Sequence, residues 1–130
     1  MHELGIATNI VEIVEHEMKA RGYRHISNIA LKIGAMTDVD HEALRFGFEV
    51  ITTGTPLSGA RLEIEAVPIK ISCKACGGSS QVEQFHFICA HCGSNNVTLL
   101  QGTELDIAYL EVDDDEAGIP ARPSSLKESI

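Results

Sequence analysis

The sequence predicts an α+β fold, with two helices on a small mixed sheet and an inserted four-cysteine zinc-ribbon module. Two stretches repeat apolar residues at helical spacing, several short stretches alternate apolar and polar residues, and all four cysteines lie within residues 73–92. We therefore predict an α+β domain made of residues 1–68 plus 104–112, a zinc-binding domain at 69–103 and a disordered tail at 113–130.

Two helices are predicted from the apolar periodicity. The first covers residues 6–21 and places Ala7, Ile10, Val14 and Met18 on one stripe, and Gly22 is its stop. The second covers residues 41–51, with Asp38 or Asp40 as its N-cap. The apolar residues of this helix, its phenylalanines included, are expected in the core: Leu44, Phe46, Gly47, Phe48 and Ile51.

Four stretches have strand character. Those at residues 29–33, 62–66 and 105–109 alternate as half-buried strands do, and the fourth lies at residues 97–100. The apolar phase changes after the second of these stretches. We interpret the change as a bulge or a change of sheet near Pro68, because a strand of period two cannot switch faces without one. The chain from residue 113 onward combines an acid run with Pro, Ser and little apolar content, which predicts disorder.

Length and charge limit the classes of function that are open to this chain. Its 130 residues suit one ordinary domain that carries a smaller module. The sequence lacks an apolar run of about 18 residues, and acidic residues interrupt the region where a secretory signal would need an apolar stretch, so we expect a soluble, cytoplasmic protein that does not enter a membrane. A net charge of −9 disfavours nucleic acid as a partner, because an acidic surface repels phosphate.

The strongest motif is the pair Cys73-x2-Cys76 and Cys89-x2-Cys92, separated by twelve residues. Two thiols in one tight turn point at the same ion, and two such turns supply the four ligands of a structural zinc site. Iron in a rubredoxin-like site uses similar spacing and remains an alternative. Two disulfides or a thioredoxin-like redox pair are disfavoured by a reducing cytosol and by the presence of two pairs. Four thiolates leave no open coordination position, so any other chemistry must lie elsewhere.

The chain begins with MHELGIAT, which places His2 and Glu3 directly after the first methionine. A terminal amine is partly neutral at cytosolic pH and can donate a lone pair to a metal. The Met1 amine, the His2 backbone nitrogen and the His2 imidazole can form fused chelate rings in one plane, which suits Ni(II) or Cu(II). Glu3 adds a carboxylate that closes the shell or orients the histidine. An ordinary polar chain end is the alternative.

Four stretches together resemble the HypA/HybF family of hydrogenase maturation proteins: MHEL, EALRFGFEV, GTPLSGARLEIEAVPIKISCKACG and CAHCGSNN. The resemblance covers residues 1–112 and implies a nickel metallochaperone that delivers Ni(II) to [NiFe]-hydrogenase. It implies a HypB-type GTPase and the hydrogenase large subunit as partners. The ligands that it implies are His2 for nickel, with Met1 and Glu3 beside it, and Cys73, Cys76, Cys89 and Cys92 for zinc. Gly5, where many relatives have Ser, and the tail depart from the family pattern.

Other side chains are weaker candidates for metal ligands. Asp40 and His41 approach the nickel only if the second helix begins near the N-terminus, and capping is the simpler role of Asp40. His16 and His25 are expected to be solvated, and four thiolates complete a zinc shell without the two histidines near the knuckles. A zinc-ribbon adaptor without nickel is the competing class. We assign no catalytic residues, because neither an open metal site with a base nor a free nucleophilic thiol is evident.

Overall fold

The computed structural model describes residues 2–130 and divides the chain into two compact units. The first unit holds the chain up to Lys32 together with Val39–Glu65 and Leu105–Ile130, and the second holds Ile33–Asp38 and Ala66–Glu104. The sequence predicts a similar division, with boundaries after residues 68 and 103, but it does not predict that segment 33–38 belongs to the second unit. Across residues 2–130 we find no helix with both the length and the apolar character of a membrane span.

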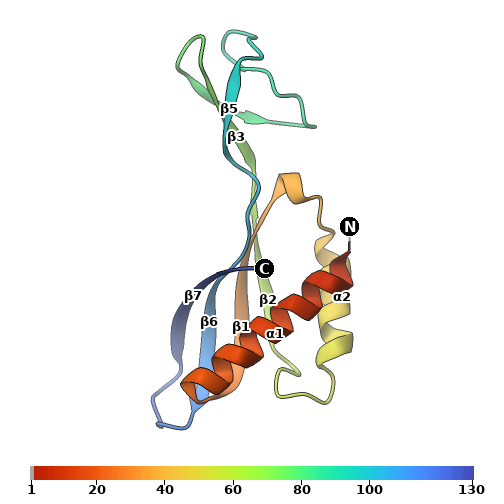
Figure 1. Ribbon diagram of the computed structural model, residues 1–130, viewed down its shortest axis with the longest axis vertical. Coiled ribbons are helices and arrows are strands. Elements are labelled where there is room, and N and C mark those ends of the chain that lie inside the picture. Colours follow the sequence, from red (N-terminus) through yellow and green to blue (C-terminus); the bar gives the residue numbers. More distant parts are fainter. Residues whose placement is uncertain (1) are drawn as a thin grey trace. The chain divides into compact units, whose positions relative to one another are not determined.

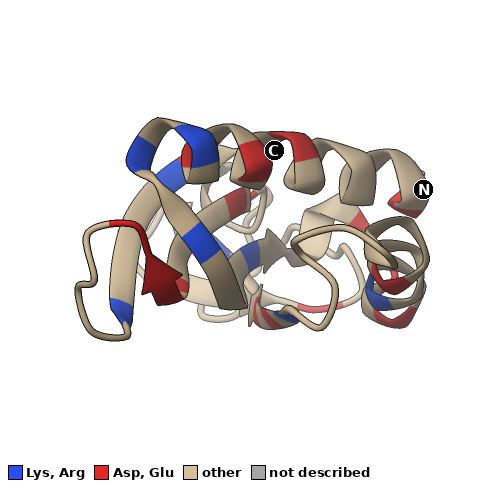
Figure 2. Cartoon of the chain, turned by 90° about the horizontal axis from the view of Figure 1, so that it is seen from below, with Lys and Arg blue, Asp and Glu red and all other residues tan. Residues whose placement is uncertain are grey.

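The first helix, α1 (Glu3–Arg21), begins at Glu3 rather than at residue 6 and ends where the sequence predicts. Gly22 follows it in a left-handed conformation with a φ of 73°, and its backbone N–H donates to the carbonyl of Met18. A side chain would be strained in this conformation, so glycine suits the end of the helix. The last turn is basic, with Lys19 and Arg21, and Figure 2 shows this basic end of α1 away from the N-terminus.

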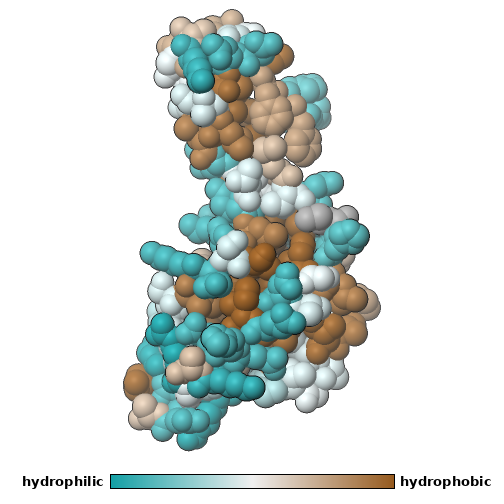
Figure 3. All heavy atoms as spheres, viewed as in Figure 1, coloured by the Kyte–Doolittle hydropathy of each residue, from teal (hydrophilic) through white to brown (hydrophobic). Residues whose placement is uncertain are grey.

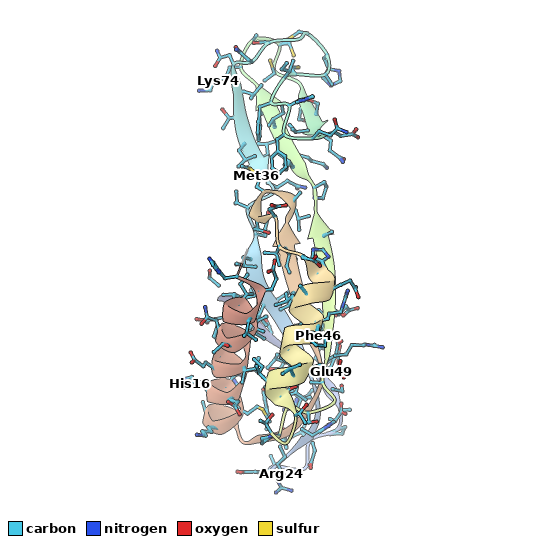
Figure 4. All side chains as sticks on the ribbon, turned by 90° about the vertical axis from the view of Figure 1, so that its right-hand side faces the viewer. His16, Arg24, Met36, Phe46, Glu49 and Lys74 are labelled. Carbon is cyan, nitrogen blue, oxygen red and sulfur yellow. The ribbon has the colours of Figure 1, made fainter. Side chains whose placement is uncertain are left out.

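The second helix, α2 (His41–Thr52), begins with a capped turn. One carboxylate oxygen of Asp40 accepts hydrogen bonds from the backbone N–H groups of Glu42 and Ala43, at 3.0 and 3.1 Å. These bonds satisfy N–H groups that have no partner inside the helix, so Asp40 rather than Asp38 is the N-cap. Figures 1 and 4 show α2 beside α1 on the same side of the sheet.

The sheet of the first unit has four strands in the order β2 (Arg61–Val67), β1 (Tyr23–Gly34), β6 (Leu105–Asp115) and β7 (Arg122–Ser129). Figure 1 shows that β1 and β2 run in the same direction and that β6 runs opposite to them, so the sheet is mixed. The predicted α+β architecture is confirmed. The fully buried side chains of this unit come from both layers: Ile10, Val14, Ile26, Ile29, Leu31, Leu44, Leu57, Ile107, Leu110 and Val112.

One expectation for α2 is wrong, because Phe46 does not lie in the core. Phe46 is 69% exposed, whereas Phe48 is 3% exposed. Each helical residue is rotated by about 100° from the one before it, so residues two apart point to nearly opposite sides of the helix. Val50 is exposed as well. Figure 3 shows apolar side chains on the surface over α2, and Figure 4 labels Phe46 on this helix.

The expectation of a disordered tail is also wrong, because β7 pairs antiparallel with β6. The turn between these strands is organised by Asp115, which is 4% exposed. Its carboxylate accepts from the backbone N–H groups of Ala117 and Ile119, at 2.9 and 3.2 Å, and from the Arg122 guanidinium at 2.6 Å. Arg122 also lies over the ring of Tyr23, 5.5 Å from its centroid. Asp115, the last of three consecutive aspartates, therefore organises a turn instead of remaining in solvent.

The second unit has a three-stranded sheet with β3 (Ile69–Cys73) between β4 (Ser79–Val82) and β5 (Val97–Gln101). Both pairings are antiparallel. Pro68 separates β2 from β3, and these strands belong to different sheets, so the predicted change of sheet is confirmed. The sequence does not predict β4, which has a single apolar residue. The core of this unit is small and consists of Ile69, Ile71 and Val82 with Met36, Phe87 and Val97 against them.

A close backbone contact explains why residues 33–38 belong to the second unit. The backbone N–H of Gly34 donates to the Glu104 carbonyl at 2.7 Å, and that of Met36 donates to the Gly102 carbonyl at 2.9 Å. A Cβ on Gly34 would lie only 2.0 Å from the carbonyl oxygen of Gly102. Any residue other than glycine at position 34 would therefore push these two backbone segments apart.

Replacing Asp115 by Asn is expected to loosen the β6–β7 hairpin and to leave α1 and α2 folded. The hydrogen bond from Arg122 is the main cause that holds the pKa of Asp115 below its ordinary value. A carboxyl whose pKa is lower in the folded state stabilises the fold above its unfolded pKa, and this contribution disappears as the pH falls through the folded pKa. The loss of hydrogen-exchange protection in β7 should therefore be full at neutral pH and should shrink below about pH 4.

The matched control for this variant is Asp114→Asn, since Asp114 is the exposed neighbour on the same strand. It should leave the protection of β7 unchanged. Equal protection of β7 in the wild type and in Asp115→Asn at neutral pH would contradict the role of this carboxylate.

Candidate functional site

The two cysteine pairs fold into matching turns. In the first turn the Gly77 N–H donates to the Cys73 carbonyl at 3.0 Å, and in the second the Gly93 N–H donates to the Cys89 carbonyl at 2.9 Å. Both glycines have positive φ, 76° and 77°. This conformation is easily reached only by glycine, which explains why a glycine follows each pair. The local sequence therefore builds the same knuckle twice.

The two knuckles bring four thiols together. The sulfurs of Cys73, Cys76, Cys89 and Cys92 all lie within 4.8 Å of one another. Cys73 and Cys92 are 3.6 Å apart at sulfur, as are Cys76 and Cys89. A disulfide needs about 2.05 Å, whereas sulfurs at about 2.3 Å from a central zinc in tetrahedral geometry lie roughly 3.8 Å apart. The four thiols therefore fit a zinc ion at their centre and do not fit disulfides.

The pKa values of these thiols also favour a bound cation. Backbone N–H groups, first of all that of Cys76, lower the pKa of Cys73 to about 6. The N–H of Ser94 acts in the same direction on Cys92, but the Cys73 sulfur and burial outweigh it and raise the pKa of Cys92 to about 12. Four adjacent sulfurs cannot all be ionised without a counter-charge. A dication removes this repulsion, and zinc would hold all four as thiolates.

The two histidines near the knuckles have other contacts. His91 lies beside the sulfurs, and its Nε2 is 3.1 Å from the carbonyl oxygen of Ser79. Gly78 leaves the space for this ring, because a Cβ there would lie 3.0 Å from the Cδ2 atom of His91. His86 forms a turn through its backbone N–H, which donates to the carbonyl of Glu83. Among residues 2–130, the four cysteines alone form a group of three or more potential metal ligands this close together.

At the N-terminus, the structure brings together residues far apart in the sequence. His2 occupies the N-cap position of α1, and its exposed side chain makes no capping hydrogen bond. The next residue, Glu3, accepts a hydrogen bond at its Oε2 from the backbone N–H of Asp40, at 3.0 Å. The condition that the sequence left open for Asp40 is met, since α2 begins beside the start of α1. Met1, also expected at this site, lies outside the described residues.

The charge around the N-terminus depends on the starts of α1 and α2 and on the carboxylates of Glu3 and Asp40. The hydrogen bond from the Asp40 N–H is the main cause that lowers the pKa of Glu3 below its ordinary value, so Glu3 is ionised at neutral pH. Asp40 caps α2 beside it. The N-terminus of a helix carries a partial positive charge, so two helix starts at one place favour anions and disfavour a cation. The two carboxylates offset this effect and supply oxygen atoms that could reach a metal.

The other histidines predicted to be solvated lie away from these groups. His16 is exposed on α1, where Figure 4 labels it. Nδ1 of His25 lies 3.0 Å from a carboxylate oxygen of Asp113. His41, in contrast, is the first residue of α2 and directly follows Asp40. These positions give no second group of metal ligands within the described part of the chain.

Comparison with known proteins gives a consistent result. A family described as "Hydrogenase/urease nickel incorporation, metallochaperone, hypA" matches residues 1–112. The hydrogenase maturation factor HypA of Syntrophus aciditrophicus is 43% identical over 115 residues, which is 88% of this chain and 100% of that protein. HypA of Desulfatibacillum aliphaticivorans is 35% identical over 129 residues, 98% of this chain and 99% of the relative. The family model ends at residue 112, as the sequence predicts, and the alignment with this one relative also extends into the tail.

Two solved structures are similar in fold. The solution structure of the Ni metallochaperone HypA from Helicobacter pylori has a TM-score of 0.59 and 23% identity, over 86% of this chain and 97% of that one. A second solution structure of a HypA protein has a TM-score of 0.63 and 24% identity, over 86% and 96% of the two chains. At these identities the likeness concerns the fold.

Substituting alanine for Cys73 or Cys92 is expected to release the metal and to unfold the second unit alone. The core of that unit is small, so metal binding should contribute most of its folding free energy. The wild type should contain about one zinc per chain. Metal analysis and hydrogen exchange, read separately for the two units, check this outcome.

His91→Ala is the matched control, since the His91 ring contacts a carbonyl and should be dispensable for zinc. Iron in the purified wild type would overturn the choice of metal. Loss of structure in both units of a cysteine variant at once would show that the units do not fold separately.

Proposed function

This chain belongs to the HypA family of nickel metallochaperones in hydrogenase maturation, and on that premise we propose that it carries Ni(II) at its N-terminus. The proposed ligands are the Met1 amine and the backbone nitrogen and imidazole of His2, with Glu3 beside them. Zinc is assigned to Cys73, Cys76, Cys89 and Cys92 as a structural ion. Family membership decides against the competing class, a zinc-ribbon adaptor without nickel.

The hydrogen bond between Glu3 and the backbone of Asp40 is the observation that supports the nickel site most directly. It fixes Glu3 at the start of α1 against the start of α2, and the residue directly before it is His2, which carries the proposed imidazole ligand. The ring makes no capping bond and is exposed, so it is available to a metal. A chain end that is anchored at Glu3 loses less conformational freedom when it chelates an ion than a frayed end would.

The coordination chemistry suits Ni(II). The amine, a deprotonated backbone nitrogen and the imidazole form two fused rings and place nitrogen atoms in one plane, a geometry that Ni(II) and Cu(II) favour. The proposed chelate forms only in a protein that keeps Met1 as its free N-terminal residue, since any residue before it would convert the amine into an amide. Glu3, or Asp40 across the helix starts, supplies an oxygen ligand or a counter-charge.

A cargo site must release its metal, and the proposed site has features that favour release. The His2 side chain is exposed, so a receiving protein can reach this ligand directly. The partial positive charges of two helix starts oppose a bound cation, and they limit the affinity that the carboxylates would otherwise provide. Four thiolates would leave the zinc ion no open coordination position. The zinc centre should therefore hold its ion while the N-terminus exchanges nickel.

The partners follow from the family. A member of this family acts with the hydrogenase maturation machinery. We propose a HypB-type GTPase and the hydrogenase large subunit as the particular partners. The family description also mentions urease, whose maturation is the second candidate destination for the nickel. The proposed setting is the cytoplasm, where thiols stay reduced and available to zinc.

Adding an N-terminal tag should weaken nickel binding even though no side chain is removed, because the Met1 amine becomes an amide. His2→Ala should weaken binding further. Affinity should also fall below about pH 7, because the nitrogen ligands must release protons to bind the metal. Calorimetric titration of Ni(II) into the untagged protein, the tagged protein and His2→Ala checks these outcomes. Mass spectrometry should verify that Met1 is intact in the untagged protein. Equal affinities in all three proteins would move nickel to another site.

The two carboxylates can be tested without disturbing the helices. Asn is as good an N-cap as Asp, so Asp40→Asn should keep α2 capped while it removes the charge. Glu3→Gln should keep an oxygen that can accept from the Asp40 N–H. Each variant should weaken the binding of Ni(II) about tenfold if the carboxylate binds or faces the ion. Asp38→Asn is the control and should change nothing. Unchanged affinity in both variants would restrict the site to nitrogen ligands.

A further inference from the structure

Three polar side chains form a row across the sheet of the first unit. Asn28 lies on β1, Glu63 on β2 and Tyr109 on β6, and β1 is the strand between the other two. Glu63 alternates with Leu62, which is buried, so Glu63 is on the opposite face of the sheet from the core. The row therefore lies on the face that α1 and α2 do not cover.

The three side chains are linked by hydrogen bonds. The Nδ2 group of Asn28 donates to Oε2 of Glu63 at 2.9 Å. The hydroxyl of Tyr109 donates to the same oxygen at 3.2 Å. Asn28 is 8% exposed, and its Oδ1 atom is buried without any hydrogen-bond partner. A buried carbonyl oxygen without a donor is costly, and such groups are uncommon in folded proteins.

A groove of about 520 Å³ surrounds this row, and Asn28 contributes to its lining. We call it the Asn28 groove, and its lining residues are Ser27, Asn28, Gly59, Arg61, Glu63, Tyr109 and Glu111. Within residues 2–130, neither Glu63 nor Glu111 takes part in an ion pair. The groove thus has two carboxylates without an ion-pair partner in its lining and lies beside a buried amide oxygen that lacks a donor.

We propose that the Asn28 groove docks an arginine side chain presented by a partner protein. A guanidinium carries five N–H donors in a planar array and no acceptor, so it can serve several oxygen atoms at once. The carboxylates of Glu63 and Glu111 supply the opposite charge, and hydrogen bonds between a guanidinium and a carboxylate are strengthened by the two charges. The aromatic ring of Tyr109 is a further surface that a guanidinium favours.

A metal ion fits this groove less well than an organic cation. Its carboxylates are only two, Glu63 and Glu111, and Oε2 of Glu63 already accepts two hydrogen bonds. Hard cations usually require more oxygen ligands than this. No group of three or more potential metal ligands occurs at this groove in the described residues. The missing feature is a set of directed N–H donors, which a guanidinium supplies and a metal does not.

The chain's own Arg61 is a competitor for the same groove. It lies in the lining and forms no ion pair with Glu63 or Glu111 among residues 2–130. Its positive charge at this place opposes the entry of a second cation. Removing it should therefore strengthen the docking of an external arginine, whereas a groove that served only to hold Arg61 would show no such gain.

The test is an NMR titration of the full chain with N-acetyl-arginine methylamide. The citrulline analogue, which has nearly the same shape without the charge, is the matched probe. The arginine probe should shift the side-chain NH2 signals of Asn28 and the backbone signals around Glu63 and Tyr109 in a saturable manner, and the citrulline probe should not. Glu63→Gln should weaken binding about tenfold, which is the loss expected for one charge-assisted hydrogen bond, and Arg61→Gln should strengthen it.

Glu49→Gln is the control, because Glu49 is an exposed acid on α2 outside this groove. It should bind the arginine probe as the wild type does. Hydrogen exchange of the free variants should show that Glu63→Gln and Arg61→Gln are folded. The proposal is overturned if the two probes shift the same signals equally, if Glu63→Gln binds as tightly as the wild type, or if Arg61→Gln binds more weakly than the wild type.

Discussion

Burial of β1 on both of its faces is the constraint on which the first unit depends. Ile29 and Leu31 are buried in the core with the helices, while Asn28 and Ala30, on the opposite face, are only 8% and 6% exposed. A central strand with two buried faces fixes its neighbours, and the core that covers one of these faces includes side chains of both helices. The start of α1 is consequently held beside the start of α2, where Glu3 meets the backbone of Asp40. The other face carries a polar residue into the interior and leaves one oxygen unsatisfied.

The two units offer different kinds of candidate metal ligands. In the second unit the candidate ligands are four cysteine thiols, whose turns are fixed by backbone hydrogen bonds, so an ion held there would be part of the fold. In the first unit the proposed ligands are nitrogen atoms at a chain end, with carboxylates nearby that already have structural tasks. The softness of the ligands favours a different ion at each site, because thiolates and nitrogen donors do not have the same relative affinities for zinc and nickel. A carrier with two metals can in this way keep one of them while it exchanges the other.

Features set by short stretches of sequence could be predicted, and features set by contacts between distant residues could not. The spacing of Cys73 and Cys76 determines a turn within a few residues, and the same holds for the stop at Gly22 and the cap at Asp40. Gly34 looks like any loop glycine until Gly102 is placed against it. Asp115 belongs by composition to a solvated run, and only the contact with Arg122 makes it structural. The proposed nickel site lies between these cases: MHEL suggests chelation, but the position of Asp40 depends on how the helices pack.

The last strand has a consequence for the solubility of the protein. Without β7, the backbone of β6 would form the edge of the sheet, and an unpaired edge can join the edge of another molecule. β7 takes over this exposed position with a sequence that is poorly suited to further pairing. Pro123 lacks a backbone N–H, and Lys127 combines a charge with a left-handed backbone conformation, with a φ of 48°. The strand therefore protects this edge of the sheet from edge-to-edge aggregation, a safeguard that matters for a carrier that must stay dispersed until it meets its receiver.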